Sequence, residues 1–343
     1  MKERILVINV NWVGDVIFST PAVRAIRRHY PAAHIAGMVV KRCEDVLRLN
    51  PHVDELIVYD ERGRDRGIAN YWRFIAMLRR KQFQRVFILH PSLKRALLAF
   101  FAGIPERAGY ATKRRAFLLT MPVPPPAHPL HKIDYFLQLL YACGIAPAGR
   151  ECEFFFSSAD EVAVNASLAQ AGVRPMSRYV VLNPGGNWLL KRWPPEYFAR
   201  LADMIIERLN LAVVIAGGPG DRALAEELTR RMRAKPVVMT GRFSLQELGA
   251  LMKHSCGVVS ADSGPMHIAV AVGAPTLALF GPTSVRLTGP VGKTAPVVLQ
   301  SEVDCRVPCY MQDCPENRCM RLISPEEVFE KINHVFQQTG GHV

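Results

Sequence analysis

The sequence lacks the features that would mark a membrane-spanning or secreted protein. Its longest unbroken apolar run, residues 96–102, is far shorter than the roughly 20 residues that cross a bilayer as a helix. Residues 2–4 are charged, and no long apolar segment with a cleavage site follows them, so a signal peptide is not indicated. We therefore expect a soluble cytoplasmic protein.

Several common catalytic motifs are also missing. The chain has no Walker A phosphate loop, no HExxH metalloprotease motif and no GxSxG nucleophile elbow. The turn after the first expected strand is not a GxGxxG dinucleotide-binding loop either. These absences disfavour kinase, metalloprotease and esterase activities.

Acidic residues are scarce in the first half of the chain. Residues 1–150 contain 24 Lys and Arg against 11 Asp and Glu, whereas residues 151–343 contain 19 of each. The whole net charge of +13 therefore comes from the first half. Such asymmetry favours an anionic partner: nucleic acid, a phosphorylated small molecule or an anionic membrane surface. The alternative is that the charge serves general solubility.

The chain has eight cysteines but no standard CxxC pair. We expect four of them, scattered in apolar surroundings, to be buried thiols: Cys43, Cys143, Cys152 and Cys256. The other four lie close together, with three, four and four residues between them: Cys305, Cys309, Cys314 and Cys319. This second group is either a structural zinc site or a set of reduced thiols.

Short apolar runs alternate with segments of helical periodicity along most of the chain. The runs typical of strands are residues 5–10, 35–40, 56–59, 86–89, 180–182, 212–216, 237–239, 258–260 and 276–280. Segments with three-to-four-residue apolar periodicity include 21–29, 72–80, 196–209 and 221–233. This alternation predicts an α/β fold of parallel sheets with crossover helices.

The pattern indicates two such units in tandem. The proline-rich stretch 122–129 is predicted to be a stiff extended connector, followed by a helix from about residue 131 to 143. We place a first domain at residues 1–170 and a second at 171–323. A final helix is expected within 324–343, where Ser324 can cap and Pro325 suits the first turn.

Residues 257–283 are the most informative stretch. An apolar run ends in Asp262, Ser263 and Gly264; a helix-like segment follows, and a second apolar run closes with residues 281–283. A similar arrangement occurs earlier, where the run 179–182 is followed by residues 183–187 and 191–194. Ligands bind at the carboxyl ends of strands in parallel sheets, and helix amino termini favour phosphate oxygens. The two turns together predict a site for a nucleotide diphosphate that carries a transferable group.

The earlier turn supplies candidate donor-binding residues. Lys191 could neutralise a diphosphate while its bond to the sugar breaks, and Gly186 and Asn187 could add hydrogen-bond donors. The alternative for Lys191 and the adjacent Arg192 is a solvated pair of charges. Asp221, after another strand, could accept from ribose hydroxyls or could simply close a turn and cap a helix.

The later turn supplies the remaining candidates of the second half. The backbone amides of Ser263 and Gly264 can meet phosphate oxygens at the start of the helix. Asp262 would repel phosphate, so we expect it to bind sugar hydroxyls. His267 lies one turn into the helix, where a lone histidine is more often structural than catalytic.

In the first half, Asp15 follows the first expected strand and the tight turn at Gly14. It is the only acid between Glu3 and Glu44. A carboxylate in this position is a candidate general base for an acceptor hydroxyl. A helix cap is the equally good alternative.

In combination, these motifs resemble those of the bacterial lipopolysaccharide heptosyltransferases, glycosyltransferase family nine, and especially its heptosyltransferase II-like members. The resemblance runs in order along nearly the whole chain. It rests on residues 14–16 with 20–22, 183–185 with 191–194, 262–267, and 280–283. Pro265 departs from the family pattern, in which a leucine is common at this position.

The resemblance implies a GT-B fold: two Rossmann-like domains with an active site between them and the final helix packed on the first domain. It implies inverting, metal-independent transfer of L-glycero-D-manno-heptose from ADP-heptose to the inner core of lipopolysaccharide. Asp15 would be the base and Lys191 the diphosphate contact. Gly186, Asn187, Asp221, Asp262, Ser263, Gly264 and His267 would bind the donor. An anionic acceptor would explain the basic first half, and peripheral contact with the cytoplasmic face of the inner membrane is compatible with it.

Two other functions remain open at this point. One is transfer from another sugar nucleotide, or to another acceptor, by an enzyme of the same fold. The other is a non-catalytic nucleotide- or nucleic-acid-binding protein that uses the basic half. The second is disfavoured because no recognisable nucleic-acid-binding module is present.

Overall fold

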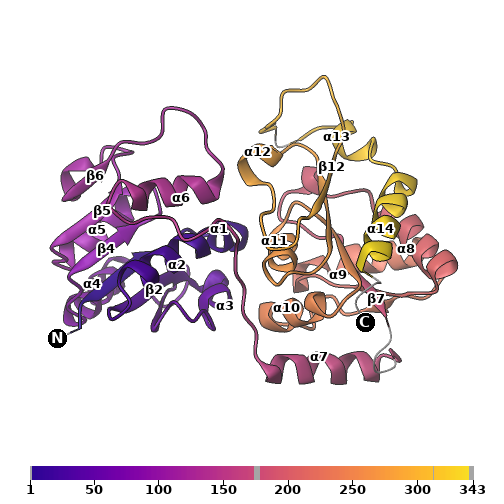
Figure 1. Cartoon of the computed structure of the whole chain (residues 1–343), viewed down its shortest axis with the longest axis horizontal. Coiled ribbons are helices and arrows are strands. Elements are labelled where there is room, and N and C mark those ends of the chain that lie inside the picture. The colour runs from indigo at the N-terminus through magenta and orange to yellow at the C-terminus, as the bar shows by residue number, and fades with distance from the viewer. Residues whose placement is uncertain (1, 174–177, 312, 340–343) are drawn as a thin grey trace. The chain divides into compact units, whose positions relative to one another are not determined.

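The computed structural model describes residues 2–173, 178–311 and 313–339. The chain forms two compact units, which we call unit 1 (Met1–Cys152) and unit 2 (Glu153–Val343). Among the described residues, each unit contains one six-stranded sheet in which all pairs are parallel (Figure 1). The predicted α/β fold class is confirmed.

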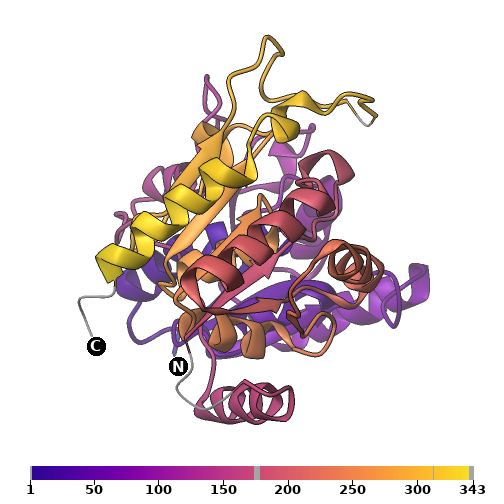
Figure 2. The same ribbon diagram turned by 90° about the vertical axis from the view of Figure 1, so that its right-hand side faces the viewer.

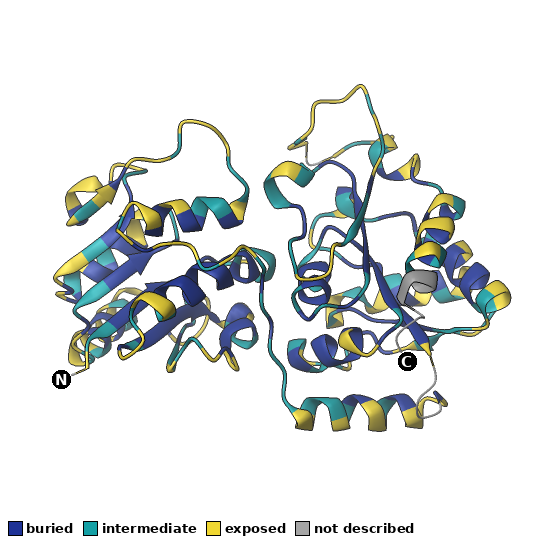
Figure 3. Ribbon diagram, in the orientation of Figure 1, coloured by how far each residue is buried: buried dark blue, intermediate teal, exposed yellow. Residues whose placement is uncertain are grey.

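The sheet of unit 1 is built on short, apolar strands. Residues 5–8 are almost completely buried, as expected of a strand covered on both faces (Figure 3). The strand order reverses at β1, because β2 and β3 lie to one side of it and β4, β5 and β6 to the other. In sheet order the strands are β3 (Glu55–Tyr59), β2 (His34–Val40), β1 (Arg4–Ile8), β4 (Arg85–Ile88), β5 (Glu106–Tyr110) and β6 (Met121–Val123).

The helices of unit 1 cover both faces of this sheet. Side chains of α4 and α5 join one face in a common core, and α1, α2 and α6 pack together elsewhere in the unit. The helices are α1 (Val13–Phe18), α2 (Thr20–His29), α3 (Glu44–Leu47), α4 (Ile68–Arg80), α5 (Leu93–Phe101) and α6 (Lys132–Tyr141).

Unit 2 repeats this plan. Its strand order reverses between β7 and β10, which are hydrogen-bonded neighbours. In sheet order the strands are β12 (Val297–Gln300), β11 (Thr276–Phe280), β10 (Gly257–Ala261), β7 (Tyr179–Asn183), β8 (Ala212–Ile215) and β9 (Val237–Val238). The helices are α7 (Ser158–Gln170), α8 (Pro195–Leu209), α9 (Arg222–Arg231), α10 (Leu245–Lys253), α11 (Gly264–Ala271), α12 (Val285–Thr288), α13 (Arg318–Arg321) and α14 (Pro325–Thr339).

The helices of unit 2 begin and end where local sequence signals predict. Helix α8 starts with Pro195 in its first turn and ends at Asn210, which has a left-handed backbone conformation. Ser324 accepts a hydrogen bond from the Glu327 N–H, which confirms the predicted start of α14. Apolar residues of α8, α9 and α14 share one core with five strands of the sheet.

Two parts of the predicted domain division differ from the structure. Helix α7, assigned above to the first domain, lies in unit 2, where it packs against α10 and Glu161 pairs with His254 at 2.7 Å. The final helix was expected on the first domain, but α14 packs against α8 in unit 2 (Figure 2). Val328 and Ile332 of α14 are completely buried there. The last four residues of the expected segment 324–343 lie outside the described residues.

In the part of the chain that the structure describes, no helix combines the length and the apolar character needed to span a membrane.

Candidate active site

The two turns singled out from the sequence of unit 2 lie side by side. One follows β7 and the other follows β10, and these strands are paired in register from Gly257 with Val180 to Ser260 with Asn183. This is the position at which the strand order reverses. In open parallel sheets, ligands bind at the carboxyl ends of the two strands between which the strand order reverses.

An ion pair joins the two turns. The Lys191 ammonium donates to Oδ2 of Asp262 over 2.7 Å, and the Thr283 hydroxyl donates to the same oxygen over 2.7 Å. On the other side, Nε2 of His267 lies 3.7 Å from Oδ1 of Asp262. Asp262 is only 5% exposed. The carboxylate that we expected on sugar hydroxyls therefore holds Lys191 in this structure.

Burial alone would raise the pKa of Asp262, but its contacts with His267 and Lys191 outweigh that effect and hold the pKa well below its usual value. The carboxylate therefore stays charged and keeps Lys191 oriented toward the head of α11. Lys191 itself is partly exposed, so it retains N–H groups for a ligand.

The low pKa of Asp262 predicts that its contribution to the free energy of unfolding decreases in acid. A depressed folded-state pKa stabilises the fold above the unfolded value of 3.8, and this contribution is lost as the pH falls from there toward the folded-state pKa. We expect Asp262→Asn to lower the free energy of unfolding by about 2 kcal/mol at neutral pH, because it removes a buried charged partner. Urea unfolding of both proteins from neutral to acid pH measures this. A difference that stays constant below pH 3.8 would contradict the assignment.

A hydroxyl and amide network lies at the start of α11. The Asn183 side-chain N–H₂ donates to the Ser260 hydroxyl over 2.8 Å and to the Ser263 hydroxyl over 3.1 Å. Ser263 is the N-cap of α11 and accepts from the Met266 N–H at 3.5 Å. Within the described residues, the backbone N–H groups of Ser263 and Gly264 make no hydrogen bond, so they can meet anionic oxygens.

The glycine turn after β7 is shaped by Asp221. Its carboxylate accepts from the Gly218 N–H at 3.0 Å and lies 3.7 Å from the Arg192 guanidinium. Asp221 therefore closes a turn, which was one of the two alternatives given for it above. It also packs on Gly185, where an added Cβ would lie under 3.0 Å from the carboxylate. Arg192 donates to the Gly186 carbonyl over 2.8 Å, and Asn187 is exposed.

This packing predicts that Gly185→Ala displaces the Asp221 carboxylate. We expect a loss of about 1 kcal/mol in the free energy of unfolding, because the bond to Gly218 is broken. Denaturant unfolding measures it, and Gly220→Ala is the matched control because a Cβ there meets nothing within 4 Å. If Gly185→Ala costs as much in an Asp221→Ala background as alone, the clash is not the cause.

In unit 1, Asp15 is the third residue of α1, whose N-cap is Trp12, so it does not occupy the capping position. Its carboxylate is partly exposed and has no hydrogen bond or ion pair with any residue that the structure describes. It lies near Cys43, whose pKa is raised to about 12, mainly by burial and to a smaller extent by Asp15. A carboxylate without another partner can accept a hydrogen bond from a ligand hydroxyl.

Three of the four clustered cysteines, Cys305, Cys309 and Cys314, lie in the segment between β12 and α13, and Cys319 lies in α13. Burial raises the pKa of Cys319, and the neighbouring thiols of Cys314, Cys305 and Cys309 contribute. All eight cysteines are free thiols. Among the described residues, no three His, Cys, Asp or Glu side chains are arranged so that they could hold a metal ion.

We next compared the chain with known protein families. The family model for "Glycosyltransferase family 9 (heptosyltransferase)" matches residues 71–319. This chain belongs to glycosyltransferase family 9. The resemblance identified from the sequence motifs is therefore confirmed, and the protein is an enzyme of the glycosyltransferase class.

Relatives of this family 9 glycosyltransferase match it over almost its full length. It is 28% identical to lipopolysaccharide heptosyltransferase 2 of Escherichia coli strain K12, over 98% of this chain and 99% of that protein. The crystal structure of a family 9 glycosyl transferase from Veillonella parvula superposes with a TM-score of 0.90, at 26% identity and 98% coverage of both chains. The structure of ADP-heptose LPS heptosyltransferase II from E. coli gives 0.81, at 27% identity and 99% and 100% coverage. These matches confirm the GT-B fold.

Sequence reasoning missed three side chains of this family 9 site. Thr283 belonged to a recognised motif, but its bond to Asp262 was not anticipated. Ser260 was taken as the last residue of an expected strand and Asn183 as the first residue of the turn after residues 179–182, but their bonds to each other and to Ser263, which organise the head of α11, were not anticipated. The available signal was a polar residue at the last position of β7 and another at the penultimate position of β10, both in otherwise apolar strands.

Proposed function

We propose that this protein transfers L-glycero-D-manno-heptose from ADP-heptose to the inner core of lipopolysaccharide, with inversion at the anomeric carbon. Family membership supports the reaction class. The names of its relatives, lipopolysaccharide heptosyltransferase 2 and ADP-heptose LPS heptosyltransferase II, support the donor and the acceptor.

The donor-binding part of this proposal rests on one observation: Asp262 holds Lys191 at the head of α11. The diphosphate of the donor would lie between the Lys191 ammonium and the N–H groups of Ser263 and Gly264. The positive end of the α11 dipole adds to this attraction. Negative charge develops on the diphosphate as its bond to the sugar breaks, so these groups stabilise the departing ADP.

We assign activation of the acceptor to unit 1. Asp15 removes the proton from the acceptor hydroxyl as its oxygen forms a bond to the anomeric carbon, and the bond from that carbon to the diphosphate breaks. A single displacement of this kind inverts the configuration. Because Lys191 and backbone amides meet the charge of the diphosphate, the proposal requires no divalent cation.

Gly186, Asn187, Asp221 and His267 complete the proposed donor site. Gly186 and Asn187 lie on the turn that carries Lys191, and Asp221 fixes that turn through Gly185 and Arg192. His267 is 5% exposed beside Asp262 and acts as a positioning residue for it.

A donor panel tests this proposal. The purified protein is given a heptose-deficient core acceptor with ADP-heptose, other ADP-sugars or UDP-sugars, with and without EDTA, and nucleotide release is followed. We expect acceptor-dependent ADP release from ADP-heptose, unaffected by EDTA. Release only from another sugar nucleotide would replace the donor assignment and favour the alternative of a different transferase of the same fold.

A further inference from the structure

The exposed side of α5 in unit 1 is apolar. This helix ends within the longest apolar run of the chain, residues 96–102. Only part of that run faces the core, because Phe100 is 44% exposed. Leu93, two helical turns before Phe100, is also exposed. A surface helix normally places polar residues on this side, so α5 departs from the usual pattern.

Helix α4, which packs against α5, adds further apolar side chains (Figure 1). Trp72 is 48% exposed, and the centre of its ring lies 5.0 Å from that of Phe101. The Phe101 ring in turn lies 5.4 Å from that of Phe100. Ile68, one turn before Trp72, is exposed. The two helices thus share one exposed apolar patch, and such patches mark surfaces that bind a partner or a membrane.

Three cations border the aromatic rings of this patch. The Arg107 guanidinium carbon lies 5.4 Å from the centre of the Phe100 ring, and the Lys94 ammonium lies 5.6 Å from that of Tyr71. Arg79 donates to the carbonyl of the last residue of α5 over 2.8 Å. None of the three cations forms an ion pair with a residue that the structure describes.

Acidic residues are missing from this part of the sequence. Residues 66–105 contain eight Lys and Arg and no Asp or Glu. The acids on either side of this stretch are each paired with an arginine: Asp65 with Arg64 at 3.2 Å, and Glu106 with Arg85 at 2.6 Å. The exposed side of α4 and α5 is therefore positive as well as apolar.

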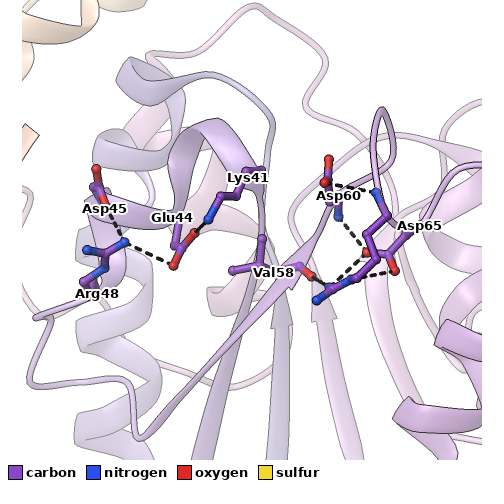
Figure 4. A network of polar contacts seen from close by, with 8 residues as sticks. Lys41, Glu44, Asp45, Arg48, Val58, Asp60 and Asp65 are labelled. Atoms are coloured by element: carbon purple, nitrogen blue, oxygen red, sulfur yellow. Dashed lines mark hydrogen bonds and ion pairs between the residues drawn. The ribbon is translucent and has the colours of Figure 1, made fainter. Parts of the chain in front are cut away.

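Other cations of unit 1 lie among carboxylates. After β2, Lys41 pairs with Glu44, and Arg48 pairs with both Glu44 and Asp45 (Figure 4). Interspersed charges of both signs are typical of a surface that stays in water. The exposed side of α4 and α5 lacks the negative charges of such a surface.

An anionic lipid bilayer matches both properties of this side. Aromatic side chains favour the interface between headgroups and acyl chains, and Lys and Arg are attracted to an anionic leaflet. A nucleic acid would match the cations but not the exposed apolar side chains. In a two-fold symmetric dimer the surface would meet itself, so its cations would face one another.

We propose that this surface, which we call the α4–α5 face (Ile68, Trp72, Arg79, Lys94, Phe100 and Arg107), binds an anionic phospholipid bilayer. The apolar side chains enter the headgroup region, and the cations contact lipid phosphates. The inference goes beyond the proposed function, because it does not depend on the sugar that is transferred. It gives the positive charge of the first half one of the three partners considered from the sequence, an anionic membrane surface.

Vesicle sedimentation tests this binding without donor or acceptor. The whole protein is mixed with vesicles of phosphatidylglycerol and phosphatidylethanolamine, or of phosphatidylcholine alone, and the bound fraction is measured at increasing salt concentration. We expect binding to the anionic vesicles only, weakened by salt because salt screens the cations. Absence of binding to the anionic vesicles, or equal binding to both kinds, would overturn the inference.

Two double variants separate the apolar contribution from the charged one. Trp72→Ala with Phe100→Ala removes exposed rings, and Arg79→Gln with Lys94→Gln removes two cations. Each pair is expected to weaken binding to the anionic vesicles about 10-fold or more. Because the replaced side chains are exposed or partly exposed, Tm should change little. Wild-type binding by either variant would contradict the assignment of the α4–α5 face.

The matched control removes the same charge from other helices of unit 1. Arg28 near the end of α2 and Lys132 at the start of α6 are exposed. Arg28→Gln with Lys132→Gln should bind the anionic vesicles nearly as tightly as the wild type. A loss equal to that of the α4–α5 variants would show that only the net charge matters, and would refute this face as the contact.

Tryptophan fluorescence locates the contact. An indole ring that moves from water into the bilayer interface emits at shorter wavelength, so anionic vesicles should shift the emission of the wild type. Trp72→Phe keeps an aromatic ring and should still sediment with the vesicles, but without the shift. The chain has four tryptophans. A shift that persists in Trp72→Phe would place another of them at the bilayer and overturn the assignment.

Analytical ultracentrifugation without lipid tests the other occupant of an apolar face, a second copy of the chain. We expect the same mass for the wild type and for Trp72→Ala with Phe100→Ala. A wild-type dimer that dissociates in this variant would assign the α4–α5 face to self-association instead of the bilayer.

Discussion

Replacing Asp15 with asparagine is expected to lower kcat for transfer by about 10²- to 10⁴-fold, the range that a positioned general base contributes. The substitution keeps the shape of the side chain but removes its ability to take the acceptor proton. ADP affinity should not change, because the proposed nucleotide site is made of unit 2 residues. Steady-state kinetics and ADP calorimetry measure the two effects.

The matched control for Asp15 is Asp45→Asn in the same unit. Asp45 pairs with Arg48 at 2.8 Å on the surface of α3, and surface pairs of this kind contribute little. This variant should retain full activity and nearly the wild-type Tm. Normal turnover by Asp15→Asn, in protein with an unchanged Tm, would remove Asp15 from the mechanism.

The second large effect is expected at Lys191. Lys191→Ala should lower kcat about 10²- to 10³-fold, as does the loss of one strong electrostatic contact to a leaving group, and should weaken ADP-heptose binding as well. Rate and affinity should fall together because the ammonium contacts the diphosphate before and during bond cleavage. Lys235→Ala, an exposed lysine before β9, is the control.

Loss of Lys191 also leaves Asp262 buried without its cation, so a fall in activity could reflect damage to the fold. The double variant Lys191→Ala with Asp262→Asn separates these effects, since it removes the buried charge along with its partner. Its Tm should recover toward that of the wild type while transfer stays slow. Recovery of transfer in the double variant would show that Lys191 is structural and not a phosphate contact.

Much of the fold could be predicted because buried parallel strands are continuous apolar runs. The expected strand at 276–280 coincides with β11, and the other eight expected strands overlap observed ones. Strands β5, β6 and β12 were missed. Residues 106–110 contain two charged residues and a glycine, and Pro122 suits only the edge position that β6 occupies.

The candidate site could be predicted only where the residues of a single turn were informative on their own. The head of α11 has a capping serine, a glycine and a following apolar helix, and all of these are local features. The pairing of Lys191 with Asp262 spans 71 positions, so no local pattern contains it. The domain boundary was placed wrongly for a similar reason: α7 is held in unit 2 by contacts with α10, which lies far from it in the sequence.

The cations of unit 1 show a further limit of sequence reasoning. The excess of positive charge in the first half was evident, and it was interpreted as affinity for an anion. Its distribution was not evident, because Lys41, Arg48 and Arg64 pair with nearby carboxylates, whereas the buried Arg115 forms no ion pair with any described residue and donates to backbone carbonyls. Only the fold separates the cations that pair with a nearby carboxylate from those that do not.

The central claim is tested most directly by analysing the product of one reaction. The protein is incubated with ADP-heptose and a heptose-deficient core acceptor, and the product is examined by mass spectrometry and by NMR of its anomeric centre. We predict an acceptor extended by one heptose, of inverted anomeric configuration, with one ADP released per product. Retained configuration, or ADP-heptose consumption that does not depend on the acceptor, would contradict the mechanism.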